Sequence, residues 1–225
     1  MNVGVVIQAR MGSTRLPGKV LRDIDGKPLL AHVMGRLEHL RHRVDKVVAT
    51  TVQEQDQQIV KWCDQYGVKH YQGSELDVLD RYWSCTQLNG FDHVVRLTAD
   101  NPFTDIEELD RLIDFHLQGG YDYSHSFGQM PIGVGAEIFS KNALKKSYEE
   151  GRNPNHREHV NEYIEETPSM FNIGRLVIPG SKISPSLRLT VDTEEDWRRA
   201  CALASASHGR WLSTEEAIRL CLPSV

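Results

Sequence analysis

The chain has 225 residues, of which 40% are hydrophobic and 25% are charged, and a chain of this length buries enough surface to form one independent core. Its 26 Lys and Arg residues stand against 31 Asp and Glu residues, and the resulting formal net charge of −5 argues against a protein that coats nucleic acid. No apolar run approaches the roughly 20 residues that cross a bilayer, the N-terminus lacks the features of a secretory signal, and the four cysteines form no CxxC pair.

These absences predict a cytoplasmic protein with no membrane segment, zinc ribbon or disulfide framework. No linker-like or repetitive stretch interrupts the chain, so we expect residues 1–225 to form a single domain. In the first half, apolar β-rich runs alternate with patterns of helical spacing. Strands are predicted over residues 3–7, 44–51, 68–71 and 91–98, and helices over residues 29–40, 59–66, 78–88 and 105–117.

The order of elements changes after about residue 121. Strands are predicted near residues 122–127, 171–178 and 187–191, around a helix at 155–166, and two helices end the chain. Alternating strands and helices with short connections predict an α/β, Rossmann-like fold with a mixed, mostly parallel sheet flanked by helices. Ligands of such folds bind beyond the carboxyl ends of the strands, so polar residues that follow strands are the first candidates for chemistry.

The loop after the first strand, Ala9-Arg-Met-Gly-Ser-Thr-Arg-Leu-Pro-Gly-Lys19, combines two glycines with three cations. Backbone N–H groups and guanidinium forks in such a loop suit a polyphosphate. It is not a Walker A loop, because Val20 stands where that motif places the Ser or Thr that holds magnesium. On composition alone, a solvated basic loop is an equal alternative.

Together with the preceding Val-Ile-Gln, this loop resembles the signature of the 3-deoxy-manno-octulosonate and acylneuraminate cytidylyltransferases, and most closely their short, polysaccharide-biosynthesis-type members. The resemblance implies that CTP is a substrate, that its triphosphate lies in the loop, and that residues 1–120 bind the nucleotide while residues 121–225 bind the acceptor. The resemblance also gives a weaker expectation that the protein forms a homodimer. The residues expected to bind the nucleotide here are Ala9, Arg10, Gly12 and Ser13, with Arg15 and Lys19 as catalytic cations.

Two aspartates follow predicted strands. Asp100 stands in Arg96-Leu-Thr-Ala-Asp-Asn-Pro102, and Asp192 stands in Leu187-Arg-Leu-Thr-Val-Asp192. Asp100 also suits a plain turn before a proline, and the residues after Asp192 read as a capped helix start. The resemblance makes Asp100 and Asp192 the ligands of Mg²⁺, an ion that usually takes one or two protein carboxylates.

A second nucleotide-binding segment is Gly73-Ser74, which lies between a strand and the helix that carries Arg81. The resemblance places this segment against cytosine, with Gly73, Ser74 and Arg81 reading the base. Arg81 equally suits an i,i+4 ion pair with Asp77.

The resemblance assigns the acceptor to two further segments. In Asn155-His-Arg-Glu-His159, the residues His156, Arg157 and His159 are expected to bind an acidic acceptor, although a solvated helix face is an open alternative and the spacing is not that of a zinc hydrolase. In the Gly133–Gly135 turn, which lacks the third glycine of a dinucleotide fingerprint, Glu137 is expected beside the acceptor. The uncharged Ile132 in this turn is expected to alter acceptor preference.

The predicted function is therefore Mg²⁺-dependent transfer of CMP from CTP to an anionic acceptor, either an acidic sugar or a small phosphonate or phosphate, with release of pyrophosphate. Two other classes stay open at this point. A non-catalytic nucleotide-binding regulator would retain the fold, and a nucleotide-sugar glycosyltransferase would require a DxD motif. The only DxD in the chain, Asp23-Ile-Asp25, stands in a loop context that does not favour such a site.

Overall fold

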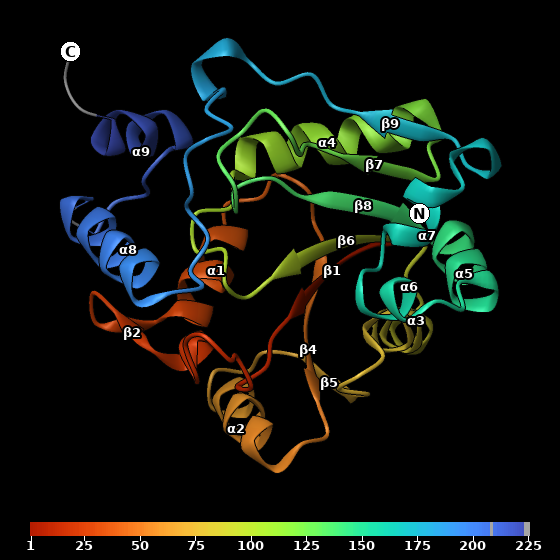
Figure 1. The fold of residues 1–225 in the computed structure, drawn as a ribbon, viewed down its shortest axis with the longest axis horizontal. Coiled ribbons are helices and arrows are strands. Elements are labelled where there is room, and N and C mark those ends of the chain that lie inside the picture. The colour runs from red at the N-terminus through yellow and green to blue at the C-terminus, as the bar shows by residue number, and fades with distance from the viewer. Residues whose placement is uncertain (208, 223–225) are drawn as a thin grey trace.

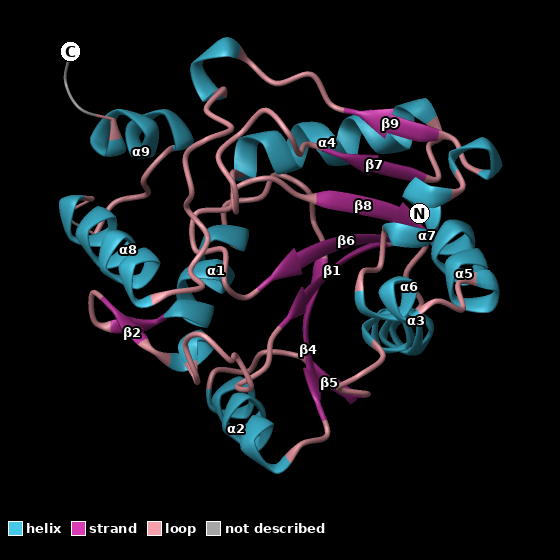
Figure 2. Ribbon diagram, in the orientation of Figure 1, coloured by secondary structure: helices cyan, strands magenta, loops and turns pink. Residues whose placement is uncertain are grey.

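The computed structural model describes residues 1–207 and 209–222. Within this part of the chain the main sheet has seven strands in the order β5-β4-β1-β6-β8-β7-β9 (Figures 1 and 2). The strands, in chain order, are β1 (Val3–Gln8), β4 (Asp45–Thr51), β5 (His70–Gly73), β6 (His93–Thr98), β7 (Tyr123–His125), β8 (Glu137–Ser140) and β9 (Ile173–Arg175). Both halves of the chain thus contribute strands to one sheet.

All neighbouring strands of this sheet pair in parallel except β8, which runs antiparallel to both β6 and β7. The mixed, mostly parallel sheet is therefore confirmed. A small hairpin of β2 (Asp23–Ile24) and β3 (Lys27–Pro28) lies outside it. In the first half, each predicted strand and helix is present, with ends that differ by a few residues from the prediction.

Helices cover both faces of the sheet. Successive residues of β1 point to opposite faces, and Val5 and Val6 accordingly belong to different core clusters. Side chains of α1 (Leu29–Leu37), α2 (Gln57–Gln65), α4 (Ile106–Gly119), α8 (Glu194–Ala206) and α9 (Thr214–Cys221) join the first cluster, whereas α3 (Val78–Asn89), α5 (Lys141–Glu150) and α7 (Glu162–Glu166) join the second. The sheet is thus buried on both sides, which explains its continuous apolar strands.

Two predictions for the second half are wrong. Residues 187–191 are extended but form no strand, because they pair only with a loop through an isolated bridge between Ile132 and Arg188. The single helix predicted over 155–166 is two short helices, α6 (Pro154–Glu158) and α7, separated where His159 adopts an extended backbone. That break lets Val160 turn inward, where its side chain is fully buried. The strand β8 and the helix α5 were not anticipated.

Candidate active site

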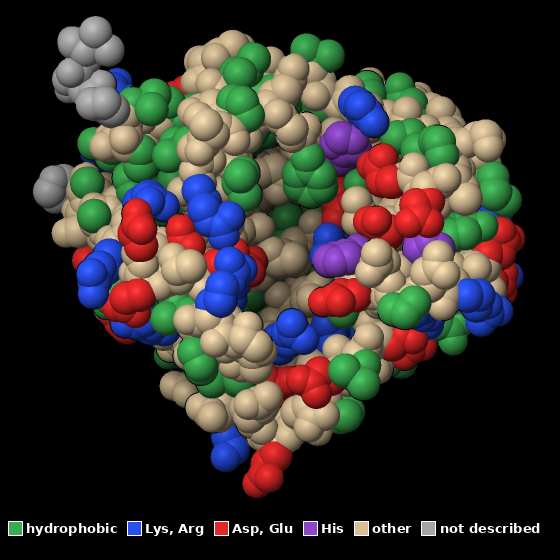
Figure 3. Space-filling view, in the orientation of Figure 1, with side chains coloured by type: hydrophobic (Ala, Val, Ile, Leu, Met, Phe, Trp, Pro, Cys, Tyr) green, Lys and Arg blue, Asp and Glu red, His purple; other side chains and the backbone are tan. Residues whose placement is uncertain are grey.

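A cavity of about 210 Å³ lies where β1 and β6 end side by side. Gln8 and Thr98, the last residues of these strands, are register partners and both line the cavity. Figure 3 shows a hollow in the middle of the face seen in Figure 1, with Lys, Arg, Asp and Glu side chains around it. The remaining lining residues come from the basic loop and from the two aspartates: Arg10, Ser13, Thr14, Arg15, Lys19, Val20, Ala99, Asp100 and Asp192.

The buried carboxylate of Asp56 anchors the basic loop to the end of β4. The Met11 N–H donates to Asp56 Oδ1 at 2.6 Å, and the Thr51 hydroxyl donates to the same carboxylate. The Met11 carbonyl in turn accepts from Gly18 N–H at 3.0 Å, and Gly18 has φ 69°, a conformation that glycine adopts without steric cost. These contacts keep the loop over the ends of the strands.

The four loop residues assigned to the nucleotide differ in what they offer. Arg10 is exposed, and Ser13 lines the cavity. Ala9 is buried, and its N–H already donates to the Ala49 carbonyl at 3.1 Å. A Cβ atom at Gly12 would lie 3.0 Å from the Nε2 end of the exposed Gln55 side chain, which can move aside.

Asp100 and Asp192, the two aspartates predicted to hold Mg²⁺, both contact Lys19. The Lys19 ammonium donates to Asp100 Oδ2, to Asp192 Oδ1 and to the Val191 carbonyl, each at 2.8 Å. Lys19 is only 7% exposed. All three ammonium hydrogens therefore have acceptors, and Lys19 joins the two carboxylates rather than pointing freely into the cavity.

Asp192 is surrounded by cations. Arg15, whose side chain is 62% exposed, lies 3.2 Å from Asp192 Oδ2, and Arg188 donates to the same oxygen. Burial acts to raise the pKa of Asp192, but the hydrogen bond and charge of Lys19, with the charges of Arg15 and Arg188, hold that pKa below its usual value. Asp192 is therefore ionised at neutral pH.

Asp100 is positioned by the turn in which it lies. The Thr98 hydroxyl donates to Asp100 Oδ1 at 2.5 Å, and Val191 N–H donates to the Asp100 carbonyl at 2.8 Å. The second of these bonds ties the two aspartate segments together through the backbone. The turn at Asp100-Asn101-Pro102 is therefore present, and the Asp100 carboxylate still lines the cavity.

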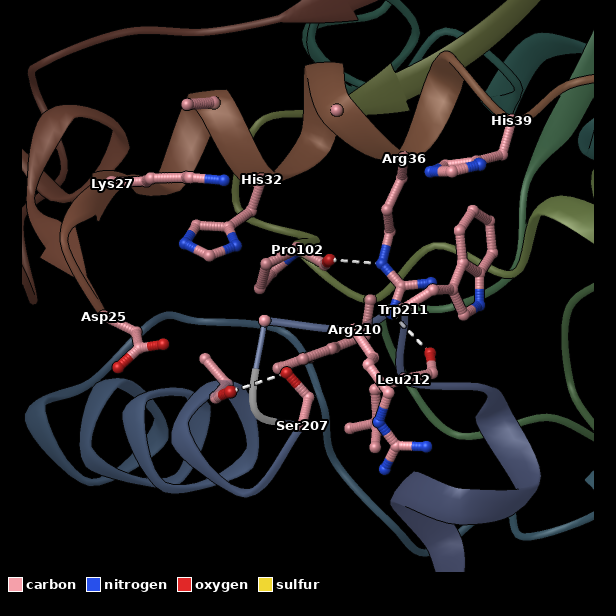
Figure 4. Close-up of a pocket in the computed structure, with 15 residues that line it drawn as sticks. Asp25, Lys27, His32, Arg36, His39, Pro102, Ser207, Arg210, Trp211 and Leu212 are labelled. Atoms are coloured by element: carbon pink, nitrogen blue, oxygen red, sulfur yellow. Dashed lines mark hydrogen bonds between the residues drawn. The ribbon is translucent and has the colours of Figure 1, made fainter.

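The same turn is held from behind by Arg36, which lines a separate cavity of about 290 Å³ between α1 and the C-terminal segment (Figure 4). The Arg36 guanidinium donates to the carbonyls of Pro102, Thr104 and Leu212 at 2.7–3.1 Å and lies 4.8 Å from the Trp211 ring centroid. Burial lowers the pKa of Arg36 to about 10. These contacts make Arg36 a clamp between α1, the turn after Asp100 and the segment before α9.

Arg81 lies at the base of the Gly73-Ser74 segment and is fully buried. Its Nη1 donates to the Ser74 carbonyl at 2.6 Å, while Nε and Nη2 have no hydrogen-bond partner among the described residues. Burial lowers its pKa. A Cβ atom at Gly73 would lie 3.1 Å from Arg81 Cγ, so Gly73 permits the close approach. The alternative ion pair of Arg81 with Asp77 does not form, because Asp77 binds Arg157 instead.

Arg157 therefore connects Asp77, at the start of α3, with the end of α5. Its Nε and Nη2 donate to Asp77 Oδ2 at 2.8 and 2.6 Å, and Nη1 donates to the Tyr148 carbonyl at 3.0 Å. This corrects the expectation that its guanidinium is free for an acceptor. Because Asp77 also caps α3 by accepting from Asp80 N–H, Arg157 links the acceptor half to the segment that carries Arg81.

His156 and Glu137 are also engaged with other protein groups. His156 is buried, with Nε2 at 2.8 Å from Glu166 Oε2. Glu137 is 1% exposed and forms a buried ion pair with Arg96. The Tyr123 hydroxyl donates to the same carboxylate at 2.7 Å. Neither side chain therefore meets the expectation of a free acceptor-binding group.

Of the remaining acceptor candidates, His159 is exposed. Its position between α6 and α7 separates it from His156, so the two histidines do not share one helix face as the sequence suggested.

Three residues of the site were missed from sequence. Gln8 ends β1 and has a buried Oε1 with no partner in the described part of the chain. The strand-end rule that selected Asp100 applies equally to Gln8, so this residue was open to prediction. Asp56 carried no such signal, because its contact with Met11 joins segments far apart in sequence. Arg188 lies only four residues before Asp192, but the strand predicted over residues 187–191 gave no sign that the two side chains would meet.

The fold and this site together define a nucleotidyltransferase: a basic loop after the first strand faces two carboxylates at the ends of neighbouring segments. A family model described as cytidylyltransferase matches residues 4–221, and the chain belongs to this family of CTP-dependent enzymes, which transfer CMP. No helix of the described residues has the length and apolar character needed to span a membrane.

Several known proteins are similar to the chain. A cytidylyltransferase from Leptospira borgpetersenii superposes with a TM-score of 0.90 at 32% identity, covering 98% of this chain and 93% of that one. The spore coat polysaccharide biosynthesis protein SpsF of Bacillus subtilis is 36% identical, over 88% of this chain and 84% of its own. A 3-deoxy-manno-octulosonate cytidylyltransferase of Methylococcus capsulatus is 36% identical over 63% of this chain and 54% of its own.

Proposed function

We propose that this enzyme transfers CMP from CTP to a small anionic acceptor in a Mg²⁺-dependent reaction that releases pyrophosphate. The observation that carries the proposal is the convergence of Asp100 and Asp192 on one cation, Lys19, beside the basic loop. An oxygen of the acceptor attacks the α-phosphorus of CTP, and the bond to the bridging oxygen breaks. Its electron pair leaves with pyrophosphate.

The donor set suits Mg²⁺. The two carboxylates are hard oxygen ligands, and the described residues contain no cluster of three or more His, Cys, Asp or Glu side chains that would hold a metal by itself. Mg²⁺ commonly takes one or two carboxylates and completes its shell with water and substrate phosphates. When bound by Asp100 and Asp192, the ion would neutralise charge on the phosphates.

The chain's own groups supply position and charge. Arg10 and Arg15 border the cavity with exposed guanidinium groups, which suit bidentate contacts with phosphate oxygens. Lys19 fixes the separation of the two carboxylates and adds a positive charge beside them. Charge on the leaving pyrophosphate grows in the transition state, so preorganised cations stabilise that state more than bound CTP.

Cytosine recognition is proposed for the Gly73–Ser74 segment and Arg81. The support is the buried guanidinium of Arg81, which retains two nitrogens with no partner among the described residues. A buried donor gains most from a ligand that pairs it, because an unpaired polar group costs about 1–3 kcal/mol. A base with acceptors on its edge supplies such a partner.

The anionic acceptor is supported by the name of the M. capsulatus relative, whose acceptor is an acidic sugar. A phosphonate or phosphate acceptor would already carry a nucleophilic oxygen, whereas a sugar hydroxyl must lose a proton. Of the groups assigned to the acceptor, His159 is the one that the structure leaves exposed.

The test is pyrophosphate release from CTP and Mg²⁺ across a panel of acidic sugars, phosphonates and phosphates. Turnover that depends on one acceptor, and that fails with ATP or GTP, would support the proposal. Tight CTP binding without pyrophosphate release for any acceptor would instead indicate a nucleotide-binding protein that does not catalyse this reaction.

A further inference from the structure

Arg188 is a cation of the site that the resemblance did not assign. Its Nη2 donates to Asp192 Oδ2, and its Nε lies 3.3 Å from Asp196 Oδ1. The side chain is 36% exposed. Arg188 therefore reaches from the extended segment before Asp192 to the carboxylate proposed to hold the metal.

Asp192 has more cationic partners than its charge requires. Lys19 occupies Oδ1, while Arg15 and Arg188 share Oδ2. Lys19 also pairs with Asp100, and Arg188 also pairs with Asp196, so three cations face three carboxylates in this cluster. Two guanidinium groups, Arg15 and Arg188, therefore share one carboxylate oxygen, and both reach the surface where a phosphate group would enter.

The base of Arg188 is fixed while its tip reaches solvent. Leu189 N–H donates to the Ile132 carbonyl at 2.8 Å, and Ile132 N–H donates to the Leu187 carbonyl at 2.8 Å, so both neighbours of Arg188 are anchored. Its side chain lines a surface cavity that also includes Arg15, and Arg15 borders the nucleotide cavity as well. A guanidinium anchored in this way can exchange one oxygen partner for another by side-chain rotation alone.

We propose that Arg188 binds the pyrophosphate portion of the nucleotide, exchanging the Asp192 oxygen for phosphate oxygens when substrate enters. This inference rests on the proposed function. The exchange would remove one of the two guanidinium groups that share Asp192 Oδ2, which opens that oxygen to the metal, and would place a second guanidinium, beside Arg15, on the leaving group. In this role Arg188 donates hydrogen bonds to oxygens of the leaving pyrophosphate, which receives the electron pair when the α-phosphorus bond breaks.

Two substitutions test Arg188 directly. Arg188→Met removes the positive charge, whereas Arg188→Lys keeps the charge but loses the planar guanidinium that can bind two oxygens at once. The matched control is Arg198→Met, which removes one positive charge from an exposed side chain paired with Glu194. The affinity for inorganic pyrophosphate without Mg²⁺ is measured by calorimetry, and CTP kinetics are measured with Mg²⁺.

Arg188→Met should weaken pyrophosphate binding by about 10-fold or more, as expected for loss of a charge-assisted contact, and should lower kcat more than it raises the KM for CTP. Arg188→Lys should show an intermediate loss, and Arg198→Met should match the wild type. Because Arg188 competes with the metal for Asp192, its loss should also lower the Mg²⁺ concentration that gives half-maximal rate.

A different pattern overturns the proposal. If Arg188→Met binds pyrophosphate like the wild type while its Mg²⁺ requirement rises, Arg188 only holds Asp192 in place. A wild-type protein that does not bind pyrophosphate also overturns it. If Arg188→Met does not fold, the comparison of Arg188→Lys with the wild type decides in the same way. Pyrophosphate binding that depends on Arg188, with no turnover of CTP, would refute the proposed function and leave this inference standing.

Discussion

At the scale of single residues, the site combines polar groups whose hydrogen bonds are all formed with buried polar groups that have no hydrogen-bond partner in the described part of the chain. Lys19 has three acceptors for its three hydrogens, whereas Gln8 and Arg81 bury polar atoms that have no partner in the described part of the chain. Buried unpaired groups are rare because they cost stability. Gln8 ends β1, and Arg81 lies in the first turn of α3 against the Ser74 carbonyl, and we expect the nucleotide to supply the missing partners there.

Asp100→Asn and Asp192→Asn should each lower turnover by at least about 100-fold, because each removes a carboxylate from an ion that contributes several kcal/mol of charge stabilisation. Pyrophosphate release at limiting Mg²⁺ measures the effect. Asp64→Asn, at a largely exposed carboxylate beside His70, serves as the control. Near-wild-type turnover in either site variant would show that the residue is not a metal ligand.

Arg81→Met should lower kcat/KM for CTP by about 10- to 100-fold, since hydrogen bonds to charged groups contribute about 1.5–3 kcal/mol. The same variant should narrow the preference for CTP over ATP. Both ratios come from steady-state kinetics, with the exposed Arg43→Met as control. An unchanged preference would remove Arg81 from base recognition.

At the scale of elements, buried ion pairs fix the segments that border the site. Lys182, 3% exposed, ends a short 3₁₀ helix (Gly180–Lys182) and lies 3.0 Å from Asp105 and 3.2 Å from Glu108 at the start of α4. The Thr214 hydroxyl donates to Asp105 at 2.6 Å. This cluster joins the segment after β9 to α4 and to the start of α9.

Lys182→Met should destabilise the fold by about 3–5 kcal/mol, because it leaves the buried carboxylate of Asp105 without its cation, while Glu108 keeps its pair with Arg111. Urea unfolding measures the change. Lys145→Met, which breaks an exposed i,i+4 pair with Glu149, should cost no more than about 0.5 kcal/mol. Equal losses in the two variants would show that the Lys182 cluster contributes no more than a surface pair.

At the scale of the whole molecule, the sheet is continuous across both halves, and a buried chain of polar groups crosses it. His93 Nδ1 lies 3.0 Å from His116 Nε2, and His116 Nδ1 lies 3.0 Å from the Ser124 hydroxyl. These residues belong to β6, α4 and β7, so the chain of contacts connects the parallel strands to the second half. Burial, with the nearby His93, lowers the pKa of His116 to about 3.

The free energy of unfolding should therefore fall as the pH falls below about 6.5, the usual pKa of an unfolded histidine. Between that pH and about 3, the unfolded chain binds a proton at His116 that the folded chain does not bind. Stability is thus complete above pH 6.5 and declines by about 2 kcal/mol from this group at pH 5. Urea unfolding at several pH values measures the slope.

The slope should be smaller in His116→Gln, which cannot titrate, and unchanged in His159→Gln, at an exposed histidine. An equal slope in His116→Gln and the wild type would place the acid sensitivity in other groups.

Sequence alone determined the parts of this protein that depend on local pattern. Apolar runs and helical spacing predicted the elements of the first half, because burial on both faces of a parallel sheet leaves a clear signal. Some short elements of the second half were not predicted, among them β8, which has four residues. The apolar pattern over residues 187–191 reflects packing against a loop rather than a strand of the sheet.

The site divides in the same way. Asp100, Asp192 and the basic loop were predictable because each follows the end of an extended segment at one edge of the sheet. The partners of these groups were not. Whether Arg157 would meet a ligand or Asp77, and whether Lys19 would meet the two aspartates, depends on which segments the fold brings together, and an ion pair forms with whichever charge is nearest in space. Tertiary structure alone decided those pairings, since distance in space does not follow from distance along the chain.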